Sequence, residues 1–288
     1  VRVGSTASDG TPSEQHLIID ALSGNVIDQW DDVYTGSAAY LAGNGRTFFS
    51  GPVGLTSDNS GSGKYTLSDP TRGGQYTLNM QNRSFGGSVF TSTNNVWGDG
   101  TLANTATLGA DAQYGATMTW DFYKNVLKRD GGIAGNGVGA ISRVHYSKKY
   151  NNAFWNNSCF CMTYGDGDGS TYNPFTSLDV AGHEMSHGLT ASTAKLIYSG
   201  ESGGLNEGTS DIFGTMVEFY ANSAADTPDY LMGEKLYKSG GGKALRYMFQ
   251  PSKDNASADC WYANVGSLNV HYSSGVANHF FYLLAEGT

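Results

Sequence analysis

Hydrophobic and polar residues alternate along the first half of the chain in the manner of β-strands. Short alternating segments such as KYTLSD and QYTLNM lie between residues 46 and 96, separated by glycine, asparagine and proline. This pattern is typical of an antiparallel, meander-like β region. Residues 16–33 predict two short strands joined at LSGN as a hairpin, followed by a glycine-rich linker, TGSAAYLAGNGRT. Residues 141–155 indicate a strand, then an edge, then a loop.

The apolar spacing becomes that of helices in the second half. It first does so at 110–129 and dominates from Ser177 onward. Three amphipathic helices are predicted within 177–194, 206–222 and 273–287. A β-rich N-terminal lobe followed by a mainly α-helical C-terminal lobe predicts an α+β fold with the active-site cleft between the lobes. The predicted parts are a hairpin and linker (1–40), a β-rich lobe (41–176) and a helical lobe (177–288).

Composition and charge narrow the function classes. The formal net charge is -9, whereas phosphate binding requires clustered lysine and arginine, so a nucleic-acid partner is not expected. No apolar run approaches ~20 residues, so no membrane-spanning segment is expected. The first ten residues lack the charged start and apolar stretch of a signal peptide. The chain is therefore either cytoplasmic or has already lost its signal.

The three cysteines leave the thiol state open. Cys159 and Cys161 form a C-x-C pair and Cys260 stands apart, so one thiol is unpaired or pairs outside this chain. A C-x-C disulfide closes a small, strained ring, and we expect it only in a secreted protein.

Two histidines lie four residues apart in VAGHEMSHGL. On a helix, His183 and His187 project from one face. This is the His-Glu-x-x-His spacing in which two histidines bind zinc and the glutamate, here Glu184, activates water. The motif is short, and helical histidines are more often packed or exposed than metal-bound. A catalytic zinc therefore needs support from a third ligand.

Residues on the next predicted helix supply that support. Glu207 lies 20 residues beyond His187 and is the candidate third zinc ligand. Asp211, four residues later on the same face, is placed to accept a hydrogen bond from a ligand histidine, and Asn206 is placed to serve the other. The independent occurrence of both patterns favours a catalytic zinc with one open position.

The chain resembles the thermolysin-like metalloendopeptidases in three stretches. Their zinc core is similar to VAGHEMSHGLTASTAKLIYSGESGGLNEGTSDIFGTMVEFYAN. Two further stretches are similar to YNNAFWNNSCFCMTYGDGDG and NVHYSSGVANHFFYLLAEG, and SCFCMTYGDG resembles secreted actinobacterial members. The resemblance covers residues 40–288. It implies a secreted, monomeric zinc endopeptidase that cleaves proteins and peptides and is inhibited by its own propeptide.

The resemblance also implies roles for residues outside the zinc ligands. Glu184 would act as the base, and Tyr198 and His271 would stabilise the developing oxyanion. From the sequence pattern alone, Tyr198 would be interpreted as a packing or surface residue and His271 as a capping or core residue. Substrate would be bound by Asn152 and Ala153 along its backbone, by Arg246 at a carbonyl, and by an apolar pocket of Val180, Leu245 and Phe175. Such a pocket predicts cleavage before Leu, Phe or Ile.

One residue departs from the family pattern next to the catalytic histidine. Similar members carry aspartate two residues before it, and this chain has Asn269. An aspartate would orient His271 and favour its charged form, whereas a neutral amide can only orient it. We therefore expect weaker alkaline-side activity than in an aspartate variant.

Calcium is the second metal that the resemblance implies. Hard oxygen ligands suit this ion, and four carboxylates match family calcium ligands: Asp179, Glu218, Asp229 and Glu234. Leu231 stands where double sites have another carboxylate, which favours one calcium rather than two. The GDGDGS stretch is not an EF-hand loop, because Thr171 and Ser177 replace its required glycine and glutamate.

Both ends of the chain affect the functional interpretation. Residues 16–30 resemble the tail of the family's propeptide, and a mature enzyme would begin near Gly36 to Gly45. Family members continue for several tens of residues beyond Thr288, so we expect a fragment whose last helix exposes apolar side chains. The alternative functions are therefore a zinc-stabilised binding domain without catalysis and an inactive, truncated peptide-binding cleft. Retention of Glu184 argues against the first, since structural zinc needs no base.

Overall fold

A computed structural model describes residues 2–6, 12–20, 23–31, 45–59 and 63–287. The strands are β1 (Arg2–Thr6), β2 (Pro12–Ile19), β3 (Val26–Asp31), β4 (Gly45–Arg46), β5 (Pro52–Val53), β6 (Asp58–Asn59), β7 (Tyr65–Thr66), β8 (Ser68–Asp69), β9 (Gln75–Arg83), β10 (Ser88–Val89), β11 (Thr91–Ser92), β12 (Ile141–Tyr146), β13 (Ala153–Asn156), β14 (Cys161–Tyr164), β15 (Leu231–Met232) and β16 (Arg246–Tyr247). The α-helices are α1 (Ala106–Asn125), α2 (Leu178–Ser192), α3 (Gly200–Ala221), α4 (Val270–Ser273) and α5 (Gly275–Glu286). Short 3-10 turns are η1 (Pro70–Arg72), η2 (Glu234–Leu236), η3 (Pro251–Asp254) and η4 (Val265–Ser267).

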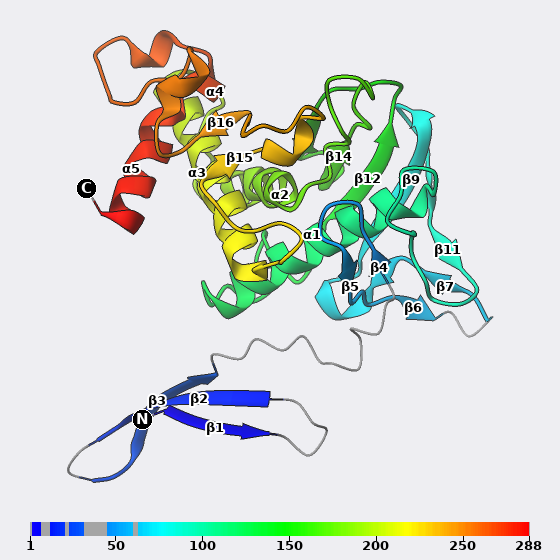
Figure 1. The fold of residues 1–288 in the computed structure, drawn as a ribbon. Helices are drawn as coiled ribbons and strands as arrows, with labels where there is room; N and C mark the ends of the chain where they lie inside the picture. Colours follow the sequence, from blue (N-terminus) through cyan, green and yellow to red (C-terminus); the bar gives the residue numbers. More distant parts are fainter. Residues whose placement is uncertain (1, 7–11, 21–22, 32–44, 60–62, 288) are drawn as a thin grey trace.

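The first three strands form a sheet of their own. The predicted hairpin is confirmed, because β2 pairs antiparallel with β3 and Ile18 lies opposite Asp28. Strand β1, which the pattern did not reveal, extends this sheet. Most of the predicted linker lies outside the described residues, as does most of the expected start of a mature enzyme. Figure 1 draws this sheet apart from the remaining elements.

The main sheet has the strand order β10-β9-β12-β14-β13, with β8 also paired to β9. Antiparallel pairing was predicted for the region before residue 96, and it holds for β9 with β10 and for β6 with β7. Strand β12, however, runs parallel to both β9 and β14. Helix α1 lies in sequence between β9 and β12 and supplies the long crossover that a parallel pair requires. Strand β13 forms the edge, but it follows the loop after β12, whereas the pattern predicted the edge before the loop.

The predicted helices are present, but two of them begin earlier than their apolar pattern. Helix α1 starts at Ala106 rather than residue 110, and α3 starts at Gly200 rather than residue 206. The early turns of α3 are rich in glycine, which carries no hydrophobic signal. The glycines are needed for packing: a Cβ at Gly203 would lie 2.5 Å from Val270 Cγ1 of α4. Tertiary contacts therefore determine where this helix begins.

Helix α2 packs between α1 and α3 near the middle of the molecule (Figure 1). Its approach to α3 is close, because a Cβ built on Gly182 would lie only 2.9 Å from the Cα of Gly214. The core around these helices includes fully buried Tyr123, Met185 and Val217. This packing fixes the distance between the two helices that carry the candidate zinc ligands. Among the described residues, no helix combines the length and apolarity needed to cross a bilayer.

Candidate active site

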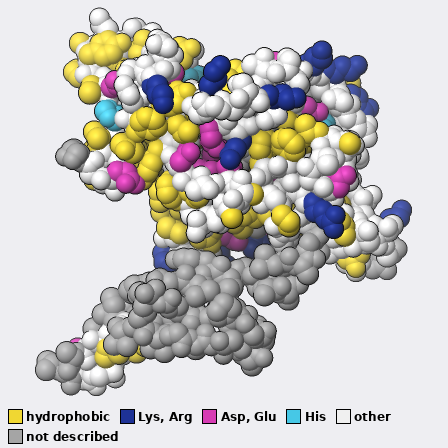
Figure 2. Space-filling model, in the orientation of Figure 1, with side chains coloured by type: hydrophobic (Ala, Val, Ile, Leu, Met, Phe, Trp, Pro, Cys, Tyr) yellow, Lys and Arg dark blue, Asp and Glu magenta, His cyan; other side chains and the backbone are white. Residues whose placement is uncertain are grey.

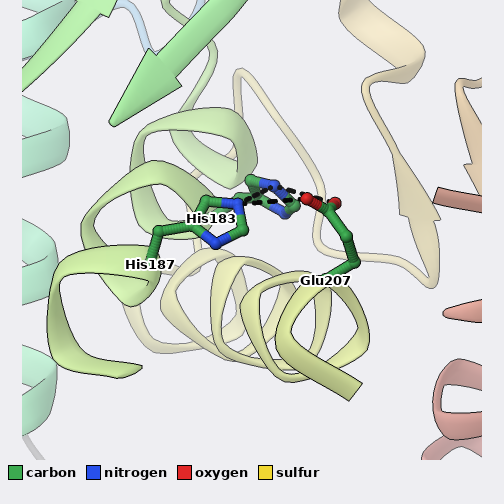
Figure 3. Close-up of side chains that lie close together, drawn as sticks. All are labelled: His183, His187 and Glu207. Carbon is green, nitrogen blue, oxygen red and sulfur yellow. Dashed lines mark hydrogen bonds and ion pairs between the residues drawn. The ribbon is translucent and has the colours of Figure 1, made fainter. Parts of the chain in front are cut away.

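Helix α2 presents the histidine pair toward α3. The helix begins after Ser177, whose hydroxyl donates a 2.6 Å hydrogen bond to Asp179 Oδ1 in the first turn. A carboxylate at this position is favourable because it interacts with the positive end of the helix dipole. One turn further on, His183 and His187 project from the same face toward Glu207 of α3, as Figure 3 shows.

The three side chains meet at distances that suit a zinc ion. The Nε2 atoms of His183 and His187 are 3.0 Å apart, and Glu207 oxygens lie 3.5 Å from the first and 3.4 Å from the second. Ligands about 2.0–2.1 Å from a tetrahedral zinc would stand roughly 3.3 Å from one another. Glu207 is fully buried, and its Oε2 has no hydrogen-bond partner among the described groups. A cation between the three would satisfy that oxygen.

The outer nitrogen of each histidine is held by a residue of α3. His183 Nδ1 donates to Asp211 Oδ1 at 2.7 Å, and His187 Nδ1 donates to Asn206 Oδ1 at 2.8 Å. Asp211 is the partner that the helical spacing predicted, and Asn206, the candidate for the other histidine, uses its side chain. Ser210 Oγ, 3.1 Å from His187 Nδ1, was missed. With Nδ1 protonated, each Nε2 keeps its lone pair free for a metal.

Asp211 is the centre of a larger buried network. Its carboxylate also accepts from Arg246, with Nε 2.6 Å from Oδ2 and Nη2 2.5 Å from Oδ1. Asn278 of α5 donates to Oδ2 at 2.8 Å. Sequence reasoning missed Asn278 and assigned Arg246 only to substrate. Arg246 also lines the cleft, so its pairing with Asp211 fixes the guanidinium at the cleft wall.

The charges at the site favour a cation. Burial would raise the pKa of Glu207, but hydrogen bonding to His187 and the charges of both histidines hold it well below its usual range. Burial would likewise lower the pKa of His187, but Glu207 and Glu184 raise it to about 9. The two carboxylates therefore attract positive charge to this point, which a divalent ion would supply.

Three further candidates surround the ligands. Glu184 is buried, which raises the pKa of its carboxyl, and it lines the cleft. The Tyr198 hydroxyl donates to Glu207 Oε1 and lies 3.4 Å from His271 Nε2. Asn269 Oδ1 accepts from the His271 backbone N–H at 3.0 Å and from Nδ1 at 2.8 Å. The structure thus brings the predicted catalytic groups together around one point.

These groups open into a cleft of about 670 Å³. Its walls include all six residues predicted to bind substrate: Asn152, Ala153, Phe175, Val180, Leu245 and Arg246. Met232 and Trp155, which sequence reasoning did not select, also line it. Trp155 lies beside α2, since a Cβ at Gly188 would be 2.6 Å from its ring.

A second cluster of carboxylates lies near β15 and the start of α2. Oxygens of Glu218, Asp226 and Glu234 can come within 4.8 Å of one another, and Figure 2 shows acidic side chains gathered here beside a basic group. Burial and mutual repulsion raise the pKa of Glu218 to about 11 and that of Glu234 to about 9. Both Glu218 oxygens are buried without hydrogen-bond partners. This arrangement suits a hard cation such as calcium.

The membership of this cluster differs from the sequence expectation. Asp226 was missed because it lies in a loop with no periodic pattern, and it pairs with Lys235 Nζ at 2.9 Å. Asp179 and Asp229 lie outside the tight group. Asp179 accepts hydrogen bonds from Val180 N and Gly233 N, and Asp229 accepts one from Leu231 N. Their charges still raise the pKa of Glu218.

The structure determines the thiol state, which the sequence left open. Cys159 and Cys161 are joined by a disulfide, and their Cα atoms are 5.2 Å apart at the turn before β14. Cys260 is a free, exposed thiol.

Comparison with known proteins gives matches along nearly the whole chain. The thermolysin metallopeptidase catalytic domain matches residues 42–191, and the thermolysin metallopeptidase alpha-helical domain matches residues 194–288. The chain is 54% identical over 287 residues to the transglutaminase-activating metalloprotease of Streptomyces mobaraensis, covering 99% of this chain and 36% of that protein. It is 39% identical over 294 residues to bacillolysin of Bacillus caldolyticus, covering 96% and 52%.

A solved structure gives the same result. The precursor of protealysin, a metalloproteinase from Serratia proteamaculans, superposes with a TM-score of 0.60 at 33% identity, covering 73% of this chain and 68% of that one. The chain spans only about a third to a half of the length of the two curated relatives above. The matched domains still include the sheet-rich lobe, the helical lobe and the cleft between them. The chain therefore belongs to the thermolysin metallopeptidase family.

Proposed function

We propose that this protein is a zinc-dependent endopeptidase that hydrolyses peptide bonds in proteins and peptides. The observation that carries the proposal is the convergence of His183, His187 and Glu207 at zinc-ligand spacing, with Glu184 retained beside them. Three protein ligands leave one position open for chemistry, whereas a structural zinc site has four.

Each group at the site has a separate role in the proposed hydrolysis. Zinc held there would lower the pKa of water and withdraw electrons from the scissile carbonyl. Glu184 accepts a proton from the attacking water and later donates it to the leaving amine. Its buried position raises its pKa and so brings it closer to a value at which both transfers are efficient. Tyr198 and His271, directed toward Glu207, stabilise the developing oxyanion.

The cleft binds the substrate as an added strand. Strand β13 is the edge of the main sheet, so its free side can pair with an extended peptide near Asn152 and Ala153. The apolar wall formed by Val180, Phe175 and Leu245 accepts a large apolar side chain on the leaving-group side. Cleavage before Leu, Phe or Ile follows, with Arg246 binding the neighbouring carbonyl.

A calcium ion at the carboxylate cluster stabilises the fold. Glu218, Asp226 and Glu234 supply oxygens, and Asp179 and Asp229 add negative charge nearby. The Lys235 ammonium already neutralises part of this charge, which supports one ion rather than two.

The N-terminal residues act as a propeptide in a secreted, monomeric protein. The catalytic-domain match begins at residue 42, whereas the Streptomyces relative matches 99% of the chain, so the first residues also correspond to part of that relative. We assign 1–40 to a propeptide and linker that inhibits the enzyme, and 41–176 and 177–288 to the two lobes. The disulfide of Cys159 supports an oxidising, extracellular location.

A single comparison separates catalysis from mere zinc or peptide binding. After cleavage of the inhibitory residues 1–40, the zinc-loaded chain should hydrolyse casein, lose activity to a chelator and regain it with zinc. Glu184→Gln should bind one zinc yet hydrolyse nothing, while Glu201→Gln, a change at an exposed α3 residue, should stay active. A zinc-loaded parent without hydrolysis would instead support the binding-domain alternative.

A further inference from the structure

A lysine lies at one end of the cleft that the proposed mechanism does not use. Lys195 follows the end of α2 and lines the cleft together with Trp155, Asn157, Ala191 and Leu196. The other four are neutral. Lys195 thus supplies the positive charge at this end.

The backbone at Lys195 is unusual for a residue with a side chain. Its φ is +53°, and its N–H donates to Thr190 O at 2.7 Å, which closes the end of α2. Glycine is the usual residue in this left-handed position because it has no Cβ to clash with the backbone. A lysine is locally disfavoured here, as it is at Lys128 and Lys149, but of these three only Lys195 lines the cleft.

The Lys195 ammonium is also available for a ligand. In the described part of the chain, it has neither an ion-pair partner nor a hydrogen-bond acceptor. Its side chain is exposed, so an ion pair formed there would be modest and sensitive to salt.

Helix geometry places Lys195 on the opposite side of the ligands from the apolar pocket. Val180 lies three residues before His183, and Ala191 lies four residues after His187. At 1.5 Å per residue, Val180 and Ala191 stand about 16 Å apart along α2, with the histidines between them. If the Val180 end takes the leaving-group side chain, the Lys195 end takes residues on the acyl side.

We propose that Lys195 binds an acidic side chain of the substrate on the acyl side of the scissile bond. The inference rests on the proposed endopeptidase function and adds a second determinant of specificity to the apolar pocket. The enzyme would then select a carboxylate before the cleaved bond together with a large apolar residue after it.

The test uses pairs of peptides that differ only in Glu or Gln at one of the three positions before the cleaved bond. Each pair is measured for kcat/KM with the zinc-loaded chain after cleavage of residues 1–40, and for Kd with the Glu184→Gln variant cleaved in the same way, which should bind without hydrolysing. We expect Glu to be preferred about two- to fivefold at one position in both assays, with the ratio falling toward 1 in 0.5 M NaCl.

Two substitutions test whether Lys195 causes the preference. Lys195→Gly suits the backbone and should bring the Glu/Gln ratio to about 1, and Lys195→Glu should invert it. The ratio cancels any general loss of folded enzyme. Equal Kd values for every Glu and Gln pair, or a preference that persists in Lys195→Gly, would overturn the proposal. A binding preference without hydrolysis by the parent would support it and remove only the endopeptidase function.

Discussion

Replacing Asp211 with asparagine should weaken zinc binding and destabilise the protein at the same time. The carboxylate accepts hydrogen bonds from His183, Arg246 and Asn278 and is fully buried. Asparagine keeps one acceptor oxygen but presents an N–H₂ group to donors on its other side. The buried Arg246 therefore loses its counter-charge, and His183 loses the carboxylate that holds its tautomer and raises its basicity.

Both losses have measurable sizes. Removing the partner of a zinc-bound histidine typically reduces metal affinity about 10–100-fold. Leaving a buried charge without its partner costs about 3–5 kcal/mol in folding free energy. For a chain of this size, that loss lowers Tm by roughly 6–15 °C. We expect both effects in Asp211→Asn.

Asn278→Ala is the matched control, because Asn278 contacts Oδ2 of the same carboxylate but not the histidine. Zinc affinity would be measured by competition with a fluorescent chelator, and Tm by calorimetry with excess zinc. The control should lose stability while its zinc affinity stays within about threefold of the parent. Parental zinc affinity in Asp211→Asn, or an equal loss in Asn278→Ala, would refute the role given to this network.

Three other predictions concern charge. In Asn269→Asp, the new carboxylate should raise the pKa of His271, which burial lowers in the parent, so the alkaline limb of kcat/KM moves to higher pH; superimposable pH profiles would contradict this. Calcium at 100 times its Kd should stabilise the parent by about 2.7 kcal/mol, and Glu218→Gln should lose this response. In chelator, the Tm of Glu218→Gln should equal or exceed that of the parent, because the buried Glu218 is repelled by Asp179 and Glu234. A parent whose thermal melt does not respond to calcium would count against the site. Burial lowers the pKa of His145, but its hydrogen bond and ion pair with Asp166 raise it overall. This pair should therefore stabilise the fold fully below about pH 6.5 and lose its contribution as the pH rises through the higher folded pKa. Over that pH range, Tm should fall less in Asp166→Asn than in the parent, and parallel curves of Tm against pH for the two proteins would refute the assignment.

The sequence predicted those parts of the site that lie on regular helices. A fixed rise and rotation per residue determine that His183 and His187 share a face, and the same rule connects Glu207 with Asp211. Asn278 could not be found in this way. It is 67 residues from Asp211, and only the packing of α5 against α3 brings the two together.

The fold was predictable to a similar extent. Alternation identified strands, but it does not encode which neighbour a strand pairs with, so the parallel pairing of β12 was missed. Asp226 was missed for a related reason, since a loop carboxylate has no period that would link it to Glu218. Both errors concern contacts between segments rather than structure within one segment.

The close approach of Gly182 to Gly214 has a consequence for metal choice and for protein design. The spacing between the two ligand-bearing helices is set by the contact of their backbones at Gly182 and Gly214, where neither residue has a Cβ. Rotamer changes in the histidines do not alter this spacing. An ion that prefers longer bonds would have to push apart two backbones rather than rotate side chains. Transferring the three ligands to another pair of helices should fail to reproduce the zinc site unless the host also has residues without side chains, such as glycine, where its helices cross.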